Sequence, residues 1–286
     1  MDVQNLSGKI ALVTGAASGI GKQTTLAFAR RGANVAICDA NEEGLKQTES
    51  ECRALGRDVI ARRVDVAKRD EMSDFAELVH GQVGAVDVLM NNAGVGLGSG
   101  FLSTSLEDWD WIVGINFWGV VYGCHFFIPP MVARGKGGHV VNVSSTAGFV
   151  ATEALAAYST TKFAVFGLSE ALRDELWPHR IGVTTVCPGL INTPITQTSR
   201  LRGPQGTAEA RQRIVQLYER RNYGPERVAQ NILRAIQRNR AVAPVAPEAW
   251  AMYFLKRLAP GLVARFNRMV ADRMRRELEG AAKTAS

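Results

Sequence analysis

The stretch Ile10-Ala-Leu-Val-Thr14-Gly15-Ala-Ala-Ser-Gly19-Ile-Gly21 decides the fold of this 286-residue chain. Its first five residues form a short apolar run, which is typical of a buried parallel strand. The glycines that follow let the backbone turn sharply and approach a bound group closely. A helix expected to begin near Gly19 would point its N–H groups and its positive dipole end at a pyrophosphate. The stretch therefore predicts a dinucleotide site, provided that it opens a βαβ unit.

Apolar, strand-like runs recur along the chain and alternate with helical stretches. They lie at residues 10–14, 34–39, 59–64, 86–91, 138–143, 182–186 and 241–245. This alternation predicts an α/β fold, a Rossmann-type doubly wound parallel sheet of about seven strands with helices on both faces. We expect residues 1–245 to form a single domain that includes a substrate loop at about 190–223, since the chain can bury a large core. Residues 246–286 are expected to add a helical C-terminal extension.

A second pattern points to acid–base chemistry. Tyr158 and Lys162 are four residues apart on an expected helix, and Ser145 precedes the tyrosine by thirteen residues. A tyrosine hydroxyl, a lysine ammonium one turn away and a serine hydroxyl can together exchange a proton with a carbonyl oxygen. A phenol with a pKa of about 10 is a poor base at neutral pH, so nearby cations must stabilise its ionised form. Joined to a dinucleotide site, this pattern predicts hydride transfer.

These motifs resemble those of the classical short-chain dehydrogenase/reductase family, in family order from about residue 7 to 245. Thr14–Gly21 is similar to the family's cofactor motif, and Asn91-Asn-Ala-Gly94 is similar to its sheet-stabilising motif. The residues similar to its catalytic tetrad are Asn116, Ser145, Tyr158 and Lys162. The resemblance implies that Tyr158 is the acid–base group and that Lys162 also binds the nicotinamide ribose. It implies that Ser145 holds the substrate oxygen and that Asn116 keeps a water in line for proton relay through Lys162.

The end of the second strand bears on the choice of cofactor. Asp39 follows the glycine loop by about twenty residues, where a carboxylate can accept hydrogen bonds from both adenosine ribose hydroxyls. A 2′-phosphate there would meet like charge, and Ser18 and Ala40 stand where NADP-preferring relatives usually carry a basic residue. Asp39 could instead be a helix N-cap. We predict NAD(H) as the preferred cofactor, with NADP(H) as the alternative.

The resemblance also implies the remaining contacts of the cofactor and the substrate. The cofactor-binding residues would be Gly15, Ser18, Gly19, Ile20, Gly21, Asp39, Asp65, Val66, Asn92, Ala93, Gly94, Tyr158, Lys162, Pro188, Gly189, Ile191 and Thr193. The substrate pocket would be lined by Leu97, Phe101, Ser145, Phe149, Leu155, Leu190 and Ile195. Most of these side chains are apolar, which suits a hydrophobic alcohol or ketone. Six arginines at 200–221 could meet an anionic substrate tail or could be solvated helix residues.

Composition narrows the remaining possibilities. The four cysteines are scattered and predict no disulfide framework, and the four histidines show no metal-ligand spacing, so we expect no metal. Without a signal-like N-terminal segment, the expected location is cytoplasmic. The net charge of +7 comes with no recognition motif for nucleic acid, so we expect no nucleic-acid partner.

Two apolar stretches suggest larger contacts. Residues 111–133 carry no charge and are long enough to span a bilayer, although Pro129-Pro130 is expected to break that helix. In the family this helix packs on a second subunit, which implies a homodimer or homotetramer. Residues 246–286 mix apolar side chains with arginines, as an interfacial helix on an anionic membrane would. The same extension could instead fold over its own subunit or its partner and cover the substrate pocket.

We therefore predict an NAD-dependent dehydrogenase or reductase acting on a hydrophobic secondary alcohol or ketone of steroid-, retinoid- or lipid-like character. A 3-oxoacyl thioester reductase is the alternative enzyme. A non-catalytic dinucleotide-sensing or membrane-binding protein is the alternative of another class. The intact set Asn116, Ser145, Tyr158 and Lys162 argues for an enzyme.

Overall fold

The computed structural model describes residues 1–2 and 4–284, and it describes side-chain surroundings through residue 272. Seven parallel strands form one sheet in the order β3-β2-β1-β4-β6-β7-β9. The strands are β1 (Ile10–Thr14), β2 (Asn34–Asp39), β3 (Val59–Arg63), β4 (Val88–Asn91), β6 (Gly138–Val143), β7 (Ile181–Pro188) and β9 (Val242–Val245). The order reverses between β1 and β4, as in a doubly wound fold, so ligands are expected at the carboxyl ends of these strands.

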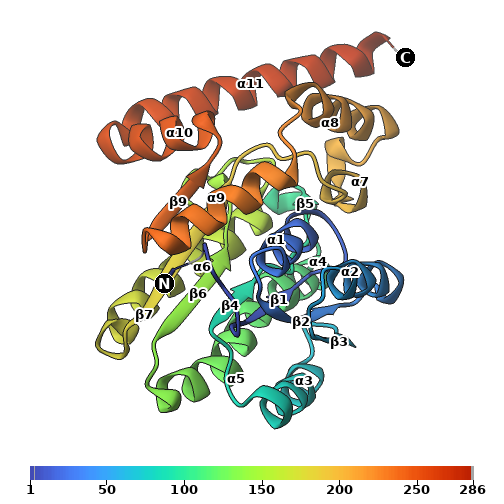
Figure 1. The fold of residues 1–286 in the computed structure, drawn as a ribbon. Coiled ribbons are helices and arrows are strands. Elements are labelled where there is room, and N and C mark those ends of the chain that lie inside the picture. Colours follow the sequence, from blue (N-terminus) through green and yellow to red (C-terminus); the bar gives the residue numbers. More distant parts are fainter. Residues whose placement is uncertain (3, 285–286) are drawn as a thin grey trace.

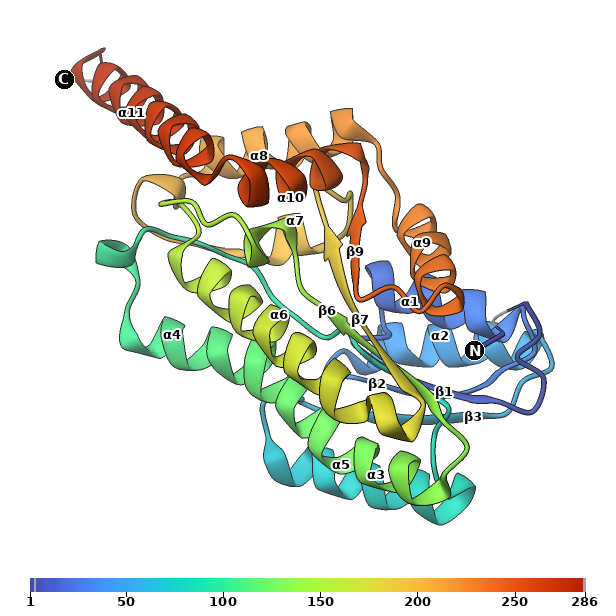
Figure 2. The same ribbon diagram turned by 90° about the vertical axis from the view of Figure 1, so that its left-hand side faces the viewer.

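Helices cover both faces of the sheet, as Figures 1 and 2 show. On one face lie α1 (Gly19–Ala29), α2 (Glu42–Ala54) and α9 (Pro225–Gln237), which pack into one apolar core. On the other lie α3 (Arg69–Val83), α5 (Gly119–Arg134) and α6 (Ala156–Leu176), which share a second core. The expected seven-stranded sheet with helices on both faces is confirmed. The inner strands β1, β2 and β4 are buried along most of their length, which is why they contain continuous apolar runs, whereas the edge strand β3 ends in the exposed Arg62 and Arg63.

One long apolar helix corresponds to residues 111–133 of the sequence. Among the described residues, Leu106–Arg134 is long and apolar enough to cross a membrane by length and composition. It consists of α4 (Leu106–Val113), a π-helical turn η2 (Gly114–Trp118) and α5. Its Val120, Phe127 and Met131 are buried in the core beneath the sheet. One side of α5 is therefore buried against the sheet, as in a core helix of a globular domain.

The expected helix break at Pro129-Pro130 was wrong, because α5 contains both prolines and continues to Arg134. A proline at position 130 cannot donate to the carbonyl of Phe126 four residues earlier. In this chain the ring Nε2 of His80 on α3 lies 3.1 Å from that carbonyl oxygen. A ring nitrogen from a neighbouring helix thus takes the place of the missing N–H, and it donates to the Phe126 carbonyl in the tautomer that carries the proton on Nε2.

The segment after β7 forms a second layer above the carboxyl ends of the strands. It contains α7 (Ile195–Thr198), β8 (Arg200–Leu201), η5 (Gly203–Gln205) and α8 (Ala208–Arg221). Strand β8 pairs in parallel with β5 (Leu97–Gly98) in a separate two-stranded sheet. The extension forms α10 (Pro247–Leu258) and α11 (Pro260–Thr284), which lie beside α8 at the same end of the molecule (Figures 1 and 2).

The C-terminal extension docks on its own subunit through one face. Tyr253 of α10 meets the ring of Phe149 edge-on at 5.4 Å, and Val263 of α11 joins the same apolar cluster. Asn267 donates a hydrogen bond of 2.9 Å to the carbonyl of Ala151. These contacts agree with the expectation that the extension folds over its own subunit. Its described residues, 246–272, do not line the cavity described below.

Candidate active site

The glycine loop between β1 and α1 is shaped for close approach. Gly15 and Gly19 both adopt positive φ angles, 67° and 54°, which favour glycine. A Cβ on Gly21 would overlap the carbonyl oxygen of Gly15. Asn92, after β4, donates from Nδ2 to the carbonyls of Thr14 (2.9 Å) and Gly15 (3.0 Å) and so ties the loop to the sheet. The first turn of α1 leaves backbone N–H groups directed at this loop, which fits a pyrophosphate.

Asp39 lies at the carboxyl end of β2, beside the glycine loop. Its Oδ2 accepts from the backbone N–H of Ala17 at 2.9 Å, and its Oδ1 accepts from that of Asn41 at 2.9 Å. The N-cap of α2 is Asn41, whose side chain accepts from the N–H of Gly44. The alternative in which Asp39 caps α2 was therefore wrong. Asp39 borders the cavity, with acceptor capacity left for ribose hydroxyls.

A cavity of about 470 Å³ opens at this end of the sheet and brings most predicted residues together. Of the predicted cofactor-binding residues, all line it except Gly21, which lies beneath Gly15. The predicted substrate residues that line it are Leu97, Ser145, Leu155, Leu190 and Ile195. The lining residues without an individual prediction include Ile115, Thr196, Ser199, Leu201, Gln205, Ile214 and Tyr218. The cavity thus joins the expected dinucleotide site to an apolar chamber.

Two predicted substrate residues lie outside the cavity lining. Phe101 is 69% exposed and meets the ring of Trp109 edge-on. Phe149 is buried against Tyr253 in the cluster that holds the extension. Both predictions followed from position in a loop, whereas the ring direction depends on neighbours distant in sequence.

Ser145, Tyr158 and Lys162 all line the cavity. Ser145 follows β6 and its Oγ accepts from the N–H of Ala147 at 3.1 Å. Tyr158 and Lys162 share one face of α6, with the Lys162 Nζ 5.7 Å from the Tyr158 ring centroid. The Nζ also donates to the carbonyl of Val143 at 3.1 Å. A substrate oxygen at this position would face a serine hydroxyl and a phenol, with an ammonium group behind.

Burial opposes charge on both titratable groups. It raises the pKa of Tyr158 to about 12, although a hydrogen bond with Ser145 lowers this pKa in part. Burial also lowers the pKa of Lys162 to about 8. At neutral pH the Tyr158 phenol is therefore uncharged, and the pKa of Lys162 lies only about one unit above the pH. A positive nicotinamide ring beside them would favour the tyrosinate that alcohol oxidation requires.

Asn116 is fully buried in the π-helical turn η2. Its Oδ1 accepts from the N–H of Val95 at 2.8 Å, and its Nδ2 donates to the Val95 carbonyl at 2.9 Å and to Thr161 Oγ1 at 3.3 Å. The side chain thus fixes the loop after β4 against α6. The relay through a water and Lys162 stays a prediction.

The site combines a glycine loop that can bind a pyrophosphate with Asp39, which is placed to bind the adenosine ribose. Beside them, Ser145, Tyr158 and Lys162 line the same cavity as a set of apolar side chains. These are the parts of a nicotinamide-dependent oxidoreductase site on a Rossmann fold.

The comparisons with known proteins agree. A family model described as short chain dehydrogenase matches residues 9–202, and the chain therefore belongs to the short-chain dehydrogenase/reductase family. It is 42% identical over 253 residues to the probable oxidoreductase EphD of Mycobacterium tuberculosis (strain H37Rv), covering 87% of this chain and 43% of EphD. The chain thus spans less than half the length of that relative.

Two further relatives match this chain over most of the length of both proteins. The 3-oxoacyl-[acyl-carrier-protein] reductase FabG of Thermotoga maritima is 36% identical, over 80% of this chain and 90% of FabG. A short-chain dehydrogenase/reductase from Burkholderia phymatum, solved in complex with NAD, has a TM-score of 0.81 and 29% identity, covering 92% of this chain and 96% of that one. An oxidoreductase of this family is thus supported from both sequence and structure.

Proposed function

We propose that this chain transfers hydride between NAD(H) and a hydrophobic secondary alcohol or ketone. The observation that carries the proposal is that Ser145, Tyr158 and Lys162 line the same cavity as a set of apolar side chains from the segments after β4, β6 and β7. Leu97, Leu155, Leu201, Ile195 and Ile214 supply apolar walls there. Such a chamber favours a hydrocarbon-rich substrate over a sugar.

Each residue would have a separate task in the reaction. NAD, when bound, would supply the hydride acceptor. Tyr158 would take the proton of the substrate hydroxyl during oxidation and return it during reduction. Ser145 would hold the substrate oxygen by a hydrogen bond, and Lys162 would stabilise the tyrosinate by its charge. Asp39 would bind the adenosine ribose hydroxyls, which supports NAD(H) over NADP(H).

A 3-oxoacyl thioester is the alternative substrate, and the likeness to FabG supports it. That reading gives the arginines at 200–221 the task of binding a carrier phosphate. Arg200 and Arg202 are already paired with Asp108, and Arg221 is paired with Glu248 at 2.7 Å. Arg211 donates to the carbonyls of Gln197 and Ser199. These internal bonds favour the uncharged ketone.

A substrate panel distinguishes the candidates. Purified protein is assayed with NADH and NADPH against 2-octanone, a steroid ketone and acetoacetyl-coenzyme A. We expect turnover of the hydrophobic ketones with NADH. Turnover of the thioester alone would favour the 3-oxoacyl reductase. Cofactor binding without turnover of any member would favour the dinucleotide-sensing alternative.

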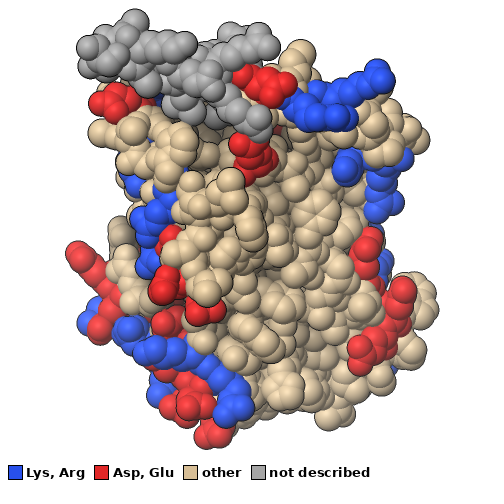
Figure 3. Space-filling model, turned by 180° about the vertical axis from the view of Figure 1, so that it is seen from behind, with Lys and Arg blue, Asp and Glu red and all other residues tan. Residues whose placement is uncertain are grey.

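We further propose that a second copy of the chain covers the side on which α4, α5 and α6 lie. Figure 3 shows that side, and charged side chains are sparse across its centre and gather near its edges. Trp118 of η2 is 46% exposed and Phe163 of α6 is 41% exposed. Trp118 also stacks on Tyr122 with centroids 5.6 Å apart. An uncharged aromatic face of this kind favours a subunit interface.

The extension has an exposed apolar stripe, formed by Phe254, Leu255, Leu258, Leu262, Phe266, Met269 and Val270. Leu262, Phe266 and Met269 recur at helical spacing, about a quarter turn around α11 from the buried Val263. The basic residues Lys256, Arg257, Arg265 and Arg268 alternate with these apolar residues along the two helices. We propose that the stripe lies on an anionic lipid surface, because its apolar side chains complement acyl chains and the nearby basic residues complement anionic headgroups.

A further inference from the structure

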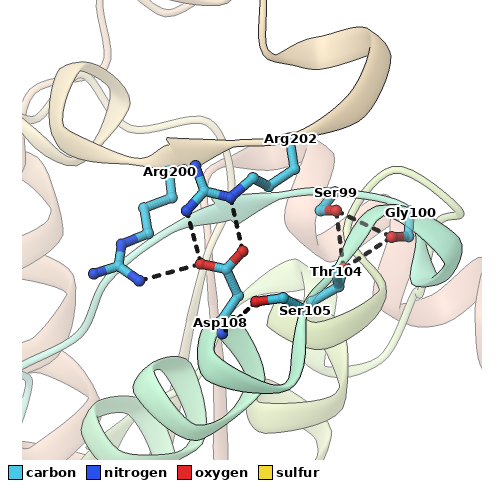
Figure 4. Close-up of polar contacts among 7 residues, drawn as sticks. All are labelled: Ser99, Gly100, Thr104, Ser105, Asp108, Arg200 and Arg202. Atoms are coloured by element: carbon cyan, nitrogen blue, oxygen red, sulfur yellow. Dashed lines mark hydrogen bonds and ion pairs between the residues drawn. The ribbon is translucent and has the colours of Figure 1, made fainter.

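A buried aspartate, Asp108, links helix α4 to the segment 200–221, which lies above the cavity. Asp108 of α4 has a side chain only 4% exposed. Its carboxylate accepts from Arg202 Nε at 2.7 Å, from Arg202 Nη2 at 2.9 Å and from Arg200 Nη1 at 3.1 Å (Figure 4). The Arg200 guanidinium also lies 3.7 Å from the centroid of the Trp111 ring. Two cations from β8 and its following residue thus converge on one carboxylate of α4.

Strand geometry connects this cluster to the cavity wall. The backbone N–H groups of Arg200 and Arg202 donate to Gly96 and Gly98 at 3.0 and 2.9 Å, so the segment is extended here. Alternate side chains of an extended segment point to opposite faces. Arg200 and Arg202 share the face that meets Asp108, and Leu201 between them lines the cavity. Fixing the two arginines therefore fixes the inward position of Leu201.

The position of the rest of the segment, residues 203–221, depends on hydrogen bonds and ion pairs. None of the residues described for α8 is buried, although Ile214 and Tyr218 of this helix line the cavity. Before α8 the chain is held by the Asp108 cluster and by Gln205, whose Nε2 donates to the Ala154 carbonyl at 3.2 Å. At its last residue, Arg221 of α8 pairs with Glu248. A helix without a buried face is positioned mainly by such ties at its ends.

We propose that Asp108 is a positioning residue that sets the size and selectivity of the substrate chamber by holding Arg200 and Arg202. This inference rests on the proposed function, since it assigns the chamber to a hydrophobic ketone. The side chain of Asp108 does not line the cavity, so its effect reaches the substrate through Leu201 and the segment that leads into α8.

Asp108→Asn tests the proposal, because it keeps the shape of the side chain and removes its charge. Hydrogen exchange of backbone amides in residues 200–221 should be at least tenfold faster than in the wild type. With 2-octanone as probe, KM should rise at least tenfold, with a smaller change in kcat and an unchanged affinity for NADH. Arg202→Gln should also speed the exchange and raise the KM. Asp108→Glu, which keeps the charge, should have a KM between those of the wild type and Asp108→Asn.

Two variants serve as controls. Arg213→Gln removes an exposed arginine of α8 and should leave exchange and KM unchanged. Asp87→Asn disrupts another buried acid, paired with Arg134 at 3.1 Å at the opposite end of the sheet, and should leave residues 200–221 unaffected. The proposal would be overturned if residues 200–221 of Asp108→Asn exchanged at the wild-type rate. It would also be overturned if Asp87→Asn sped exchange in these residues as much as Asp108→Asn does. If the wild type does not reduce 2-octanone, the proposed function fails for that ketone, while exchange still decides the role of Asp108.

Discussion

Replacement of Lys162 by methionine should stabilise the protein while removing its activity. Lys162 is 4% exposed, and burial lowers its pKa from the ordinary 10.5 to about 8. At 1.36 kcal/mol for each tenfold change in proton affinity, holding the charged lysine in the folded state costs about 3 kcal/mol at neutral pH. Methionine has a similar length, fills the same space and carries no charge. Under the proposed function, the lysine would serve the chemistry at a cost in stability.

The net gain is smaller than this cost. The substitution also removes the hydrogen bond from Nζ to the Val143 carbonyl, which is worth about 1 kcal/mol. We therefore expect Lys162→Met to be more stable by about 2 kcal/mol at pH 7. For a chain of this size the midpoint of thermal unfolding should rise by roughly 4–8 °C.

The sign of the pH dependence follows from the lowered pKa. Below about pH 8 the lysine is charged in the folded and the unfolded state, so the wild type carries the full cost. Between about pH 8 and 10.5 the folded protein loses the proton first, and the cost declines. The advantage of Lys162→Met should therefore fall by about 2 kcal/mol between pH 7 and pH 9.5.

Thermal and urea unfolding of wild type and variant across this pH range provide the assay. Lys136→Met, at an exposed lysine, serves as the matched control and should change stability little. A less stable Lys162→Met protein at pH 7, or a stability difference that is constant with pH, would show that burial of the charged lysine does not carry this cost.

Three further outcomes are expected. Asp39→Ala should weaken NADH binding about a hundredfold, since two charge-assisted hydrogen bonds of about 1.5 kcal/mol each are lost, and should leave NADPH binding unchanged or tighter in a fluorescence titration. We expect the wild type to be an oligomer and Trp118→Arg to be a monomer in light scattering coupled to size-exclusion chromatography, and an equal mass for the two proteins would exclude the α4–α6 interface. Leu262→Ser with Phe266→Ser should reduce co-sedimentation with phosphatidylcholine vesicles containing phosphatidylglycerol at least about tenfold. Leu102→Ser, at a 98% exposed leucine elsewhere, is the control for that loss.

The fold was predictable because its signals are local. Each strand contains apolar residues close together in the sequence, and the observed bounds differ from the expected ones by at most two residues, as in β7 (Ile181–Pro188) against 182–186. The helix through Pro129-Pro130 was not predictable in the same way. The group that accommodates it, His80, is 46 residues from Phe126 along the chain.

The site was predictable where backbone geometry requires particular residues. Gly15, Asp39, Tyr158 and Lys162 sit at strand ends or on one helix face, so their meeting follows from topology. The outer chamber was less predictable, because Asp108 and Arg202 are separated by 94 residues and nothing local pairs them. For the same reason the sequence left open whether the six arginines at 200–221 were solvated, and four of them, Arg200, Arg202, Arg211 and Arg221, form internal hydrogen bonds or ion pairs.

The most direct test of the central claim compares wild type with Tyr158→Phe in the reduction of 2-octanone by NADH. Phenylalanine keeps the ring and removes only the hydroxyl that would exchange the proton. We predict a fall in turnover of at least about a hundredfold, with NADH affinity in a fluorescence titration unchanged. Turnover by Tyr158→Phe at the wild-type rate would show that the Tyr158 hydroxyl is not the acid–base group.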